Sequence, residues 1–350
     1  MSAVTEGEQV PVQAQVRLKG DQLLVVSPVD MIEACFSVSS VRALRNARPG
    51  LGLAVLAPET SVPLWHAVTG LQEVIAYPES AGSRQIAGYL QDSSFRADSS
   101  LAWEASEASA SVVKAGIAQR VGYDCKPLRR HLTDLCPGRP LHGPVGHRVR
   151  FYMDLVEQLG IDGYVESSFL TPPRPPRSAP FHIGLVPGST LGDSYCWGVE
   201  RFGQLGEQLL SQPEVEVSII ACPGGMTEAT VLSRRLDKEI KDFSEGADAA
   251  AFLETLSRCS LVVSNDGLAP HLAAHLGVPT VAIFGPGDPV AMRPLGRQHR
   301  VLSQHVDCSP CSASTCPLKH HRCLEELPVA RVYEAVDSLL GDRAQAGPEG

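Results

Sequence analysis

The sequence predicts an α/β protein made of two similar domains, and three features of the chain support this. Its 350 residues are enough for two domains of ordinary size, each with its own core. Short apolar runs alternate with segments of helical spacing, which is typical of a parallel sheet covered by helices. A proline-rich segment interrupts this alternation near the middle of the chain, and the alternation then begins again.

Strands in the first half are expected where short apolar runs occur, and helices where apolar residues recur three or four positions apart. We expect strands at 22–26, 51–57, 73–77 and 120–124, and helices at 37–47, 62–68 and 149–159. The Ser/Ala-rich segment 78–110 has too weak a pattern to assign. Residues 125–146, rich in Pro, Gly and Arg, are expected to form a loop.

The boundary between the domains is expected at TPPRPPRSAP, residues 171–180, which holds five prolines in ten residues. Proline suits neither a helix interior nor a central strand, and its stiffness suits a spacer. The predicted domains are therefore 1–170 and 181–341, with a disordered tail at 342–350.

The second domain repeats the pattern of the first and places three polar loops together. We expect strands at 182–188, 215–225, 260–266 and 280–285, and helices at 199–210, 228–236, 249–257 and 270–276. Open α/β sheets bind ligands at the carboxyl ends of their strands. Three such ends carry Gly, Ser, Thr or Asp, at 187–190, 223–225 and 265–267, so a ligand site is expected there.

Composition excludes several classes of protein. The formal net charge is −9 and the pI about 5.7, which disfavours a nucleic-acid partner. The polar N-terminus lacks the pattern of a signal peptide, and no apolar run approaches the roughly 20 residues that span a bilayer. We therefore expect a cytoplasmic protein that contacts a membrane at most peripherally.

The stretch SNDGLAPHLAAHLGVPTVAIFGPGDP, residues 264–289, has the pattern of an anion site. Gly267 permits a positive φ, and the free amides of the helix that follows would attract an anion. His271 lies in the first turn and could donate to a phosphate, or it could be a capping or packing residue. Neither G-x-G-x-x-G nor a P-loop motif occurs in these loops, which disfavours an NAD enzyme and a P-loop NTPase.

Three segments carry a resemblance to a known family: the stretch just quoted, VPGSTLGDSYCWGVERF (186–202) and CSPCSASTCPLKHHRC (308–323). Together with 25–50 and 120–124, they resemble glycosyltransferase family 9, the lipopolysaccharide heptosyltransferases. The resemblance implies a GT-B fold, in which two Rossmann-like domains face each other across a cleft. It also implies an inverting, metal-independent transfer from a nucleotide sugar, usually ADP-heptose, to a glycolipid of the lipopolysaccharide core at the inner membrane.

The resemblance assigns roles to individual residues, although three positions depart from the family pattern. Glu33, after Ile32, takes the place of the usual Gly-Asp pair and would be the base. Tyr195 takes the place of a Lys that contacts the phosphates. The loop Asp266-Gly267-Leu268 replaces Asp-Ser/Thr-Gly, losing the hydroxyl. The expected donor-binding residues are Gly188, Ser189, Thr190, Glu228, Asp266, Gly267, Leu268 and His271.

These departures leave three interpretations open. The chain is a divergent active transferase with Glu33 as base, a transferase that uses a different donor, or a nucleotide-sugar-binding protein with weak or no catalysis. A sugar-nucleotide epimerase of similar shape is less favoured, because the loops resemble those of the transferases.

Four clustered cysteines, Cys308, Cys311, Cys316 and Cys323, are dense enough to hold zinc, but they lack paired C-x2-C spacing. A disulfide is disfavoured in the cytosol. The favoured interpretation is a compact loop of free thiols beside the cleft, with a structural zinc site as the alternative and no cofactor required.

Overall fold

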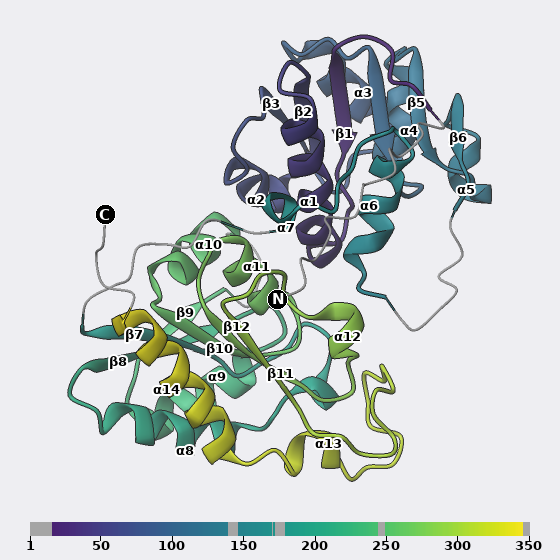
Figure 1. Ribbon diagram of the computed structural model, residues 1–350. Helices are drawn as coiled ribbons and strands as arrows, with labels where there is room; N and C mark the ends of the chain where they lie inside the picture. The colour runs from purple at the N-terminus through teal and green to yellow at the C-terminus, as the bar shows by residue number, and fades with distance from the viewer. Residues whose placement is uncertain (1–15, 139–145, 170, 172–178, 244–248, 346–350) are drawn as a thin grey trace, which may run out of the picture.

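The computed structural model describes residues 16–138, 146–169, 171, 179–243 and 249–345, and it shows two α/β domains (Figure 1). Most of the predicted linker 171–180 lies outside the described residues. No helix in the described ranges is both long and apolar enough to cross a membrane.

Each domain is built on one parallel six-stranded sheet, and the two sheets have the same topology. The first has the order β3-β2-β1-β4-β5-β6 and the second β12-β11-β10-β7-β8-β9. The strands are β1 (Gln22–Val26), β2 (Gly52–Pro58), β3 (Glu73–Tyr77), β4 (Ser99–Ala102), β5 (Gln119–Tyr123), β6 (Asp134–Cys136), β7 (Phe181–Val186), β8 (Val215–Ala221), β9 (Ile240–Asp242), β10 (Leu261–Asn265), β11 (Thr280–Phe284) and β12 (His299–Ser303). Counted within each domain this is the Rossmann order 3-2-1-4-5-6, so the predicted fold class is confirmed.

Helices cover both faces of each sheet. Those of the first domain are α1 (Met31–Ala47), η1 (Glu59–Ser61), α2 (Val62–His66), α3 (Ser83–Asp92), α4 (Glu107–Lys114), α5 (Lys126–Arg129), α6 (Val149–Glu157) and α7 (Glu166–Phe169). Those of the second are η2 (Asp193–Tyr195), α8 (Val199–Leu210), α9 (Met226–Leu236), α10 (Ala249–Arg258), α11 (Leu268–His275), α12 (Pro289–Met292), α13 (Arg322–Glu325) and α14 (Val329–Gln345).

Some elements differ from the sequence-based expectation. The unassigned segment 78–110 contains α3, β4 and α4. Strand β4 has the sequence SSLA, and Ser99 is accommodated in the buried sheet because its hydroxyl lies within hydrogen-bond distance of two acceptors, Lys19 O at 2.7 Å and Gln119 Oε1 at 2.8 Å. The expected loop 125–146 contains α5 and β6. The prediction of a disordered tail is wrong for 342–345, because α14 continues to Gln345.

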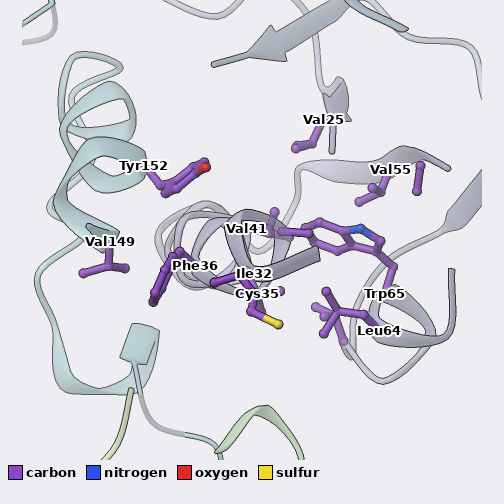
Figure 2. Packing of buried hydrophobic residues seen from close by; sticks show 14 of the residues in the cluster. Val25, Ile32, Cys35, Phe36, Val41, Val55, Leu64, Trp65, Val149 and Tyr152 are labelled. Atoms are coloured by element: carbon purple, nitrogen blue, oxygen red, sulfur yellow. The ribbon is translucent and has the colours of Figure 1, made fainter. Parts of the chain in front are cut away.

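Helix α1 is one of the elements that join the two domains. Its apolar residues pack on β1, β2, α2 and α6, as Figure 2 shows around Phe36, Val41 and Tyr152. The same hydrophobic cluster continues into α10 and α11 of the second domain, where it includes Phe252 and Leu272. One apolar core therefore runs from one sheet to the other.

Buried polar groups lie inside this apolar interface. Thr171 donates to His275 O at 3.0 Å and accepts from Arg42 at 3.3 Å. His275 is 8% exposed, and its Nε2 has no hydrogen-bond partner among the described residues. Burial first, and then the neighbouring Arg42, lower the pKa of His275 to about 3. The imidazole is therefore neutral at pH 7.

The neutral His275 predicts a loss of stability in acid. An unfolded histidine binds its proton below pH about 6.5, whereas the folded His275 resists protonation down to about pH 3. The stabilising contribution is therefore complete above pH 6.5 and falls as the pH is lowered from there. We compare the free energy of unfolding at pH 7 and at pH 5. The decrease over this range should be about 1–2 kcal/mol smaller for His275→Asn than for the wild type.

Urea titration at several pH values measures this difference. The exposed His66 gives the matched control, since His66→Asn should follow the wild-type pH profile. Parallel profiles for His275→Asn and the wild type would show that His275 is protonated in the folded protein.

Candidate functional site

Three loops of the second domain meet at the carboxyl edge of its sheet, as the sequence predicts. Strands β10, β7 and β8 are neighbours, so the loops that follow them are adjacent. The backbones at Gly188 and Gly225 approach so closely that a Cβ on Gly188 would overlap the Cα of Gly225. A Cβ on Gly267 would lie 3.2 Å from the hydroxyls of both Ser189 and Thr190.

Gly267 suits this place for a second reason. Its φ is +148°, in the region that favours glycine, and it immediately precedes α11. Ser189 donates from its hydroxyl to Asp266 O at 2.6 Å. A hydroxyl from the loop after β7 therefore lies beside Gly267, the position where the family pattern has Ser or Thr. The first and fourth strands of this sheet, β7 and β10, flank the switch point where doubly wound sheets bind ligands.

Asn265 fixes these loops relative to one another. Its Nδ2 donates to Pro187 O at 2.6 Å and to Gly188 O at 3.2 Å, and its Oδ1 accepts from the Trp197 amide at 2.9 Å. The side chain is 2% exposed. One carboxamide thus holds the loop after β7 and the segment that carries Tyr195 against the end of β10.

Asp266 points into a confined space beside Tyr195 and Gly287. The Asp266 carboxyl lies so close to Gly287 that no side chain would fit there, and the Tyr195 ring borders the same point. Burial raises the pKa of Asp266 to about 7, although the Gly267 amide opposes this. Burial, and then Asp266, raise the pKa of Tyr195, so its phenol keeps its proton and can donate.

The Cys-rich loop, residues 308–323, contacts the segment that carries Tyr195. Ser194 donates to Ala313 O, and its amide to Ser314 O at 3.4 Å. The amides of Cys311 and Ser312 donate to Pro286 O at 3.0 and 2.8 Å. The loop 308–323 therefore lies beside the site, as expected, and it supports both Tyr195 and the turn after β11.

Two predicted donor-binding residues lie on the helices that follow the glycine loops. Glu228 lies in the first turn of α9, and its Oε2 is buried without a partner among the described residues. His271 is 3% exposed and packs edge-on against Phe36 of α1, with ring centroids 4.9 Å apart. Burial first, and then His147 and His299, lower the pKa of His271 to about 3, so it is uncharged. Its predicted contact with a phosphate stays a prediction.

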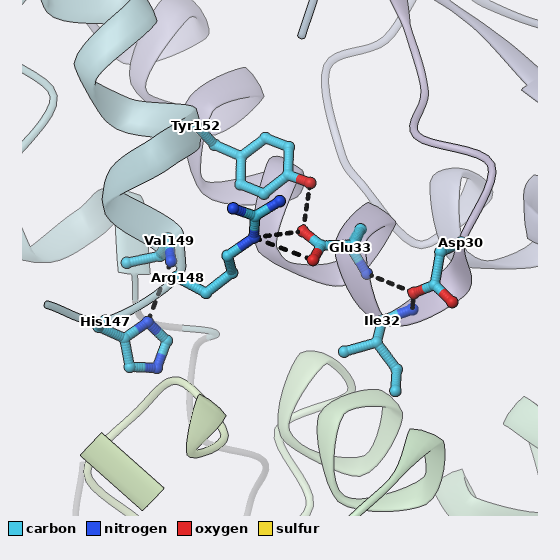
Figure 3. Close-up of polar contacts among 7 residues, drawn as sticks. All are labelled: Asp30, Ile32, Glu33, His147, Arg148, Val149 and Tyr152. Atoms are coloured by element: carbon cyan, nitrogen blue, oxygen red, sulfur yellow. Dashed lines mark hydrogen bonds and ion pairs between the residues drawn. The ribbon is translucent and has the colours of Figure 1, made fainter. Parts of the chain in front are cut away.

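Glu33 belongs to the first domain and is held by two partners that the sequence did not indicate. Asp30 caps α1 by accepting from the amides of Ile32 and Glu33 at 2.9 and 3.0 Å. The Glu33 carboxylate accepts from Arg148 Nε at 2.9 and 3.0 Å and from the Tyr152 hydroxyl (Figure 3). Its side chain is 23% exposed.

Residues 147–148 connect this cluster to the second domain. The Arg148 amide donates to Ala291 O at 2.8 Å, and His147 Nε2 lies 2.8 Å from Arg293 O. Arg148 and Tyr152 lie four residues apart on one helical face, which is the one sequence signal that could have linked them. Nothing in the sequence connects either to Glu33, which is more than one hundred positions away.

Comparison with known proteins identifies the family. A profile of glycosyltransferase family 9 (heptosyltransferase) matches residues 97–322. The chain belongs to glycosyltransferase family 9. The predicted family is therefore confirmed.

Two curated relatives illustrate the range of similarity. Lipooligosaccharide heptosyltransferase 2 of Campylobacter jejuni subsp. jejuni serotype O:2 is 28% identical over 166 residues, 45% of this chain. The chain spans about half the length of this relative, 50%. Lipopolysaccharide heptosyltransferase 2 of Escherichia coli K12 is 25% identical over 359 residues, covering 91% of this chain and 98% of that protein.

A solved structure agrees over most of the chain. The E. coli ADP-heptose lps heptosyltransferase II superposes with a TM-score of 0.72 at 20% identity, covering 92% of this chain and 99% of that one. This likeness confirms the predicted GT-B fold of family 9.

The four thiols of the Cys-rich loop share one small cavity. Cys308, Cys311, Cys316 and Cys323 line it together with His320, whose Nε2 lies 3.9 Å from Cys308 Sγ. None of these four cysteines is in a disulfide bond. Within the described ranges, no group of three or more metal-binding side chains is arranged to hold an ion. The zinc site therefore stays a hypothesis.

The role of Asn265 predicts the effect of its removal. Asn265→Ala leaves Trp197 N–H and Pro187 O buried without partners, which costs about 2–4 kcal/mol. A nucleotide ligand of these loops should bind more weakly as well, because the loop after β7 is released. Chemical denaturation and calorimetry measure the two effects, with the exposed Asn46→Ala as control. Unchanged stability would mean that water replaces the carboxamide.

The raised pKa of Asp266 predicts the opposite pH dependence to that of His275. The folded carboxyl titrates near pH 7 and the unfolded one near 3.8, so its stabilising contribution is complete below pH 3.8 and is lost as the pH rises towards 7. Relative to Asp266→Asn, the wild type should lose roughly 2–4 kcal/mol of unfolding free energy between pH 4 and pH 7.5. Denaturation at both pH values tests this, with Asp92→Asn as control, and equal slopes would refute it.

Proposed function

We propose that this chain is an inverting, metal-independent heptosyltransferase that uses ADP-heptose. The observation that carries the proposal is the convergence of the loops after β7 and β10 at the switch point of the second sheet. Membership of family 9 and the GT-B fold support the reaction class. The name of the E. coli structural relative supports ADP-heptose as donor, and the names of the curated relatives support a lipopolysaccharide-core saccharide as acceptor.

The donor would lie along the three glycine-containing loops. The amides at the start of α11 offer donors to the diphosphate, and Thr190 and the Tyr195 phenol add hydroxyl donors. Ser189, whose hydroxyl donates to Asp266 O, holds the loop in place beside them. The unpartnered Oε2 of Glu228 would accept from ribose hydroxyls. Leu268 follows Gly267 and lines the adjacent cavity between the domains, next to the sugar.

In the proposed reaction, Glu33 takes the proton from an acceptor hydroxyl. The hydroxyl oxygen bonds to the anomeric carbon as the bond from that carbon to the diphosphate oxygen breaks, and ADP leaves with the electron pair. Arg148 and Tyr152 orient the carboxylate, and the helix N-terminus of α11 stabilises the charge that develops on ADP. No step requires a metal ion, so chelation with EDTA should leave turnover unchanged.

One set of observations favours a second candidate, a nucleotide-sugar-binding protein with weak catalysis. Glu33 is already engaged by Arg148 and Tyr152, which compete with an acceptor hydroxyl for its lone pairs. Tyr195 brings no positive charge where the family pattern has Lys. Either feature would slow transfer without preventing the donor from binding.

The acceptor is proposed to be presented at the inner face of the cytoplasmic membrane, to which the protein would bind peripherally. The lipooligosaccharide and lipopolysaccharide in the names of the relatives support a glycolipid acceptor of this kind.

Calorimetric titration with ADP, UDP and GDP, followed by turnover with ADP-heptose, tests the proposal. We expect ADP to bind best, and Glu33→Gln to lower kcat by about 10²–10⁴-fold while the Kd for ADP changes less than about threefold. The exposed Glu214→Gln is the matched control.

Each other outcome has a definite meaning. Preference for UDP or GDP would keep the fold and change the donor. ADP binding with negligible turnover in the wild type would favour the binding protein. Turnover that survives Glu33→Gln would show that Glu33 is not the base.

A further inference from the structure

His147 lies where three parts of the molecule meet. Its Nε2 lies 2.8 Å from the carbonyl oxygen of Arg293, the residue that ends α12 in the second domain. Its Nδ1 accepts from the Val149 amide at 3.1 Å, at the start of α6 (Figure 3). Its ring packs edge-on against Phe36 of α1, with ring centroids 5.3 Å apart. One imidazole therefore contacts two helices of the first domain and the backbone of the second.

The hydrogen bonds of His147 determine its tautomer. Because the Val149 amide donates to Nδ1, the proton of the neutral ring is on Nε2, which donates to Arg293 O. Burial lowers the pKa of His147, although the hydrogen bond to Arg293 O opposes this, so the ring is neutral at pH 7. Both nitrogens are engaged within the protein, which favours a positioning role over direct contact with a substrate.

The residue that follows His147 holds the proposed base. Arg148 Nε donates to both carboxylate oxygens of Glu33, at 2.9 and 3.0 Å, and its guanidinium lies over the Phe151 ring, 4.4 Å from the centroid. The Arg148 amide donates to Ala291 O at 2.8 Å. The backbone and side chain of 147–148 thus bond to α12 twice, while the Arg148 side chain reaches back to Glu33. The position of this guanidinium therefore depends on the second domain.

The α12 segment continues the wall of the proposed donor site. The Asp266 carboxyl lies against Gly287, and the next residue, Asp288, caps α12 by accepting from two amides of its first turn. Ala291 and Arg293, the partners of 147–148, come four and six residues after Gly287. A short, capped segment therefore connects the proposed donor site to the side chain that holds the proposed base.

We propose that His147 is a positioning residue, which acts through Arg148 to set the Glu33 carboxylate relative to the donor site of the second domain. This inference rests on the proposed function and adds the residue that keeps base and donor at a fixed separation. In-line displacement needs the base, the acceptor hydroxyl and the anomeric carbon aligned, and a misplacement of about 1 Å can lower the rate about 10²-fold. The bond from Nε2 to Arg293 O crosses between the domains, whereas the bond from the Val149 amide only caps α6.

Two substitutions separate these hydrogen bonds. His147→Gln places an amide donor near the position of Nε2 and so keeps the bond to Arg293 O. His147→Asn places an acceptor near the position of Nδ1 and so keeps the bond from the Val149 amide. His147→Ala keeps neither bond. His66→Ala, at an exposed position on α2, is the matched control.

Steady-state kinetics of the full chain, with ADP-heptose and a heptose-deficient lipopolysaccharide core oligosaccharide, measures kcat and KM for each variant. We expect His147→Ala and His147→Asn to lower kcat by roughly 10–100-fold, while the acceptor KM and the Kd for ADP change less than about threefold. His147→Gln should recover kcat to within about threefold of the wild type, and His66→Ala should match it. Urea titration verifies that each variant is folded under the assay conditions.

A double-mutant cycle tests the route through Arg148. Arg148→Ala should itself lower kcat by roughly tenfold or more, because it releases the Glu33 carboxylate. Since His147 acts through Arg148, the double variant should have a kcat within about threefold of that of Arg148→Ala. Two independent roles would instead multiply the two losses.

The outcomes distinguish this inference from the proposed function. An unchanged kcat in His147→Ala or Arg148→Ala, losses that multiply in the double variant, or rescue by His147→Asn in place of His147→Gln would overturn the positioning role and leave the transferase assignment intact. Rescue by His147→Asn would mean that His147 only caps α6. No transfer by the wild type despite ADP binding would overturn the proposed function, and this inference with it.

Discussion

The carboxamide of Asn265 holds together the part of the molecule on which the proposed chemistry depends. It ends a buried strand, and its three hydrogen bonds join the loop after β7, the segment that carries Tyr195, and the end of β10. Without these bonds the carbonyls and amides of the loops would have no fixed partners at the bottom of the site. Asn265 therefore has a positioning role. It fixes the places of Ser189, Asp266 and Gly267 and does not itself face the cleft.

The domain interface imposes a second constraint on the site. Phe36 on α1 packs against His271 on α11, so the helix that begins at the proposed base touches the helix that begins at the proposed diphosphate site. The apolar cluster on both sides makes separation of the domains costly, because it would expose Phe252, Leu272 and their partners to water. The spacing between base and donor is thus fixed by packing.

Much of the fold could be predicted from the sequence. The apolar run 22–26 indicates a buried strand, and the apolar residues of 199–210 recur at helical spacing. Strand β4 could not, since its sequence SSLA is not an apolar run, and the partners of Ser99 in the buried sheet, Lys19 and Gln119, are distant in the sequence. In the site, the loops at 187–190 and 265–267 were predicted because parallel strands bring their carboxyl ends together. The pairing of Glu33 with Arg148 and Tyr152 was not, since it depends on how α6 packs against α1.

The repeated strand order has a consequence for how such a protein can change over time. Because both sheets follow the order 3-2-1-4-5-6, each domain turns its own set of loops towards the shared cleft, and the two sets are encoded in separate halves of the gene. The connections of the first set follow four neighbouring strands, β3, β2, β1 and β4. Mutations in the first half of the gene can therefore change the acceptor that the protein binds. The second half, which encodes the proposed nucleotide site, is left unchanged by them.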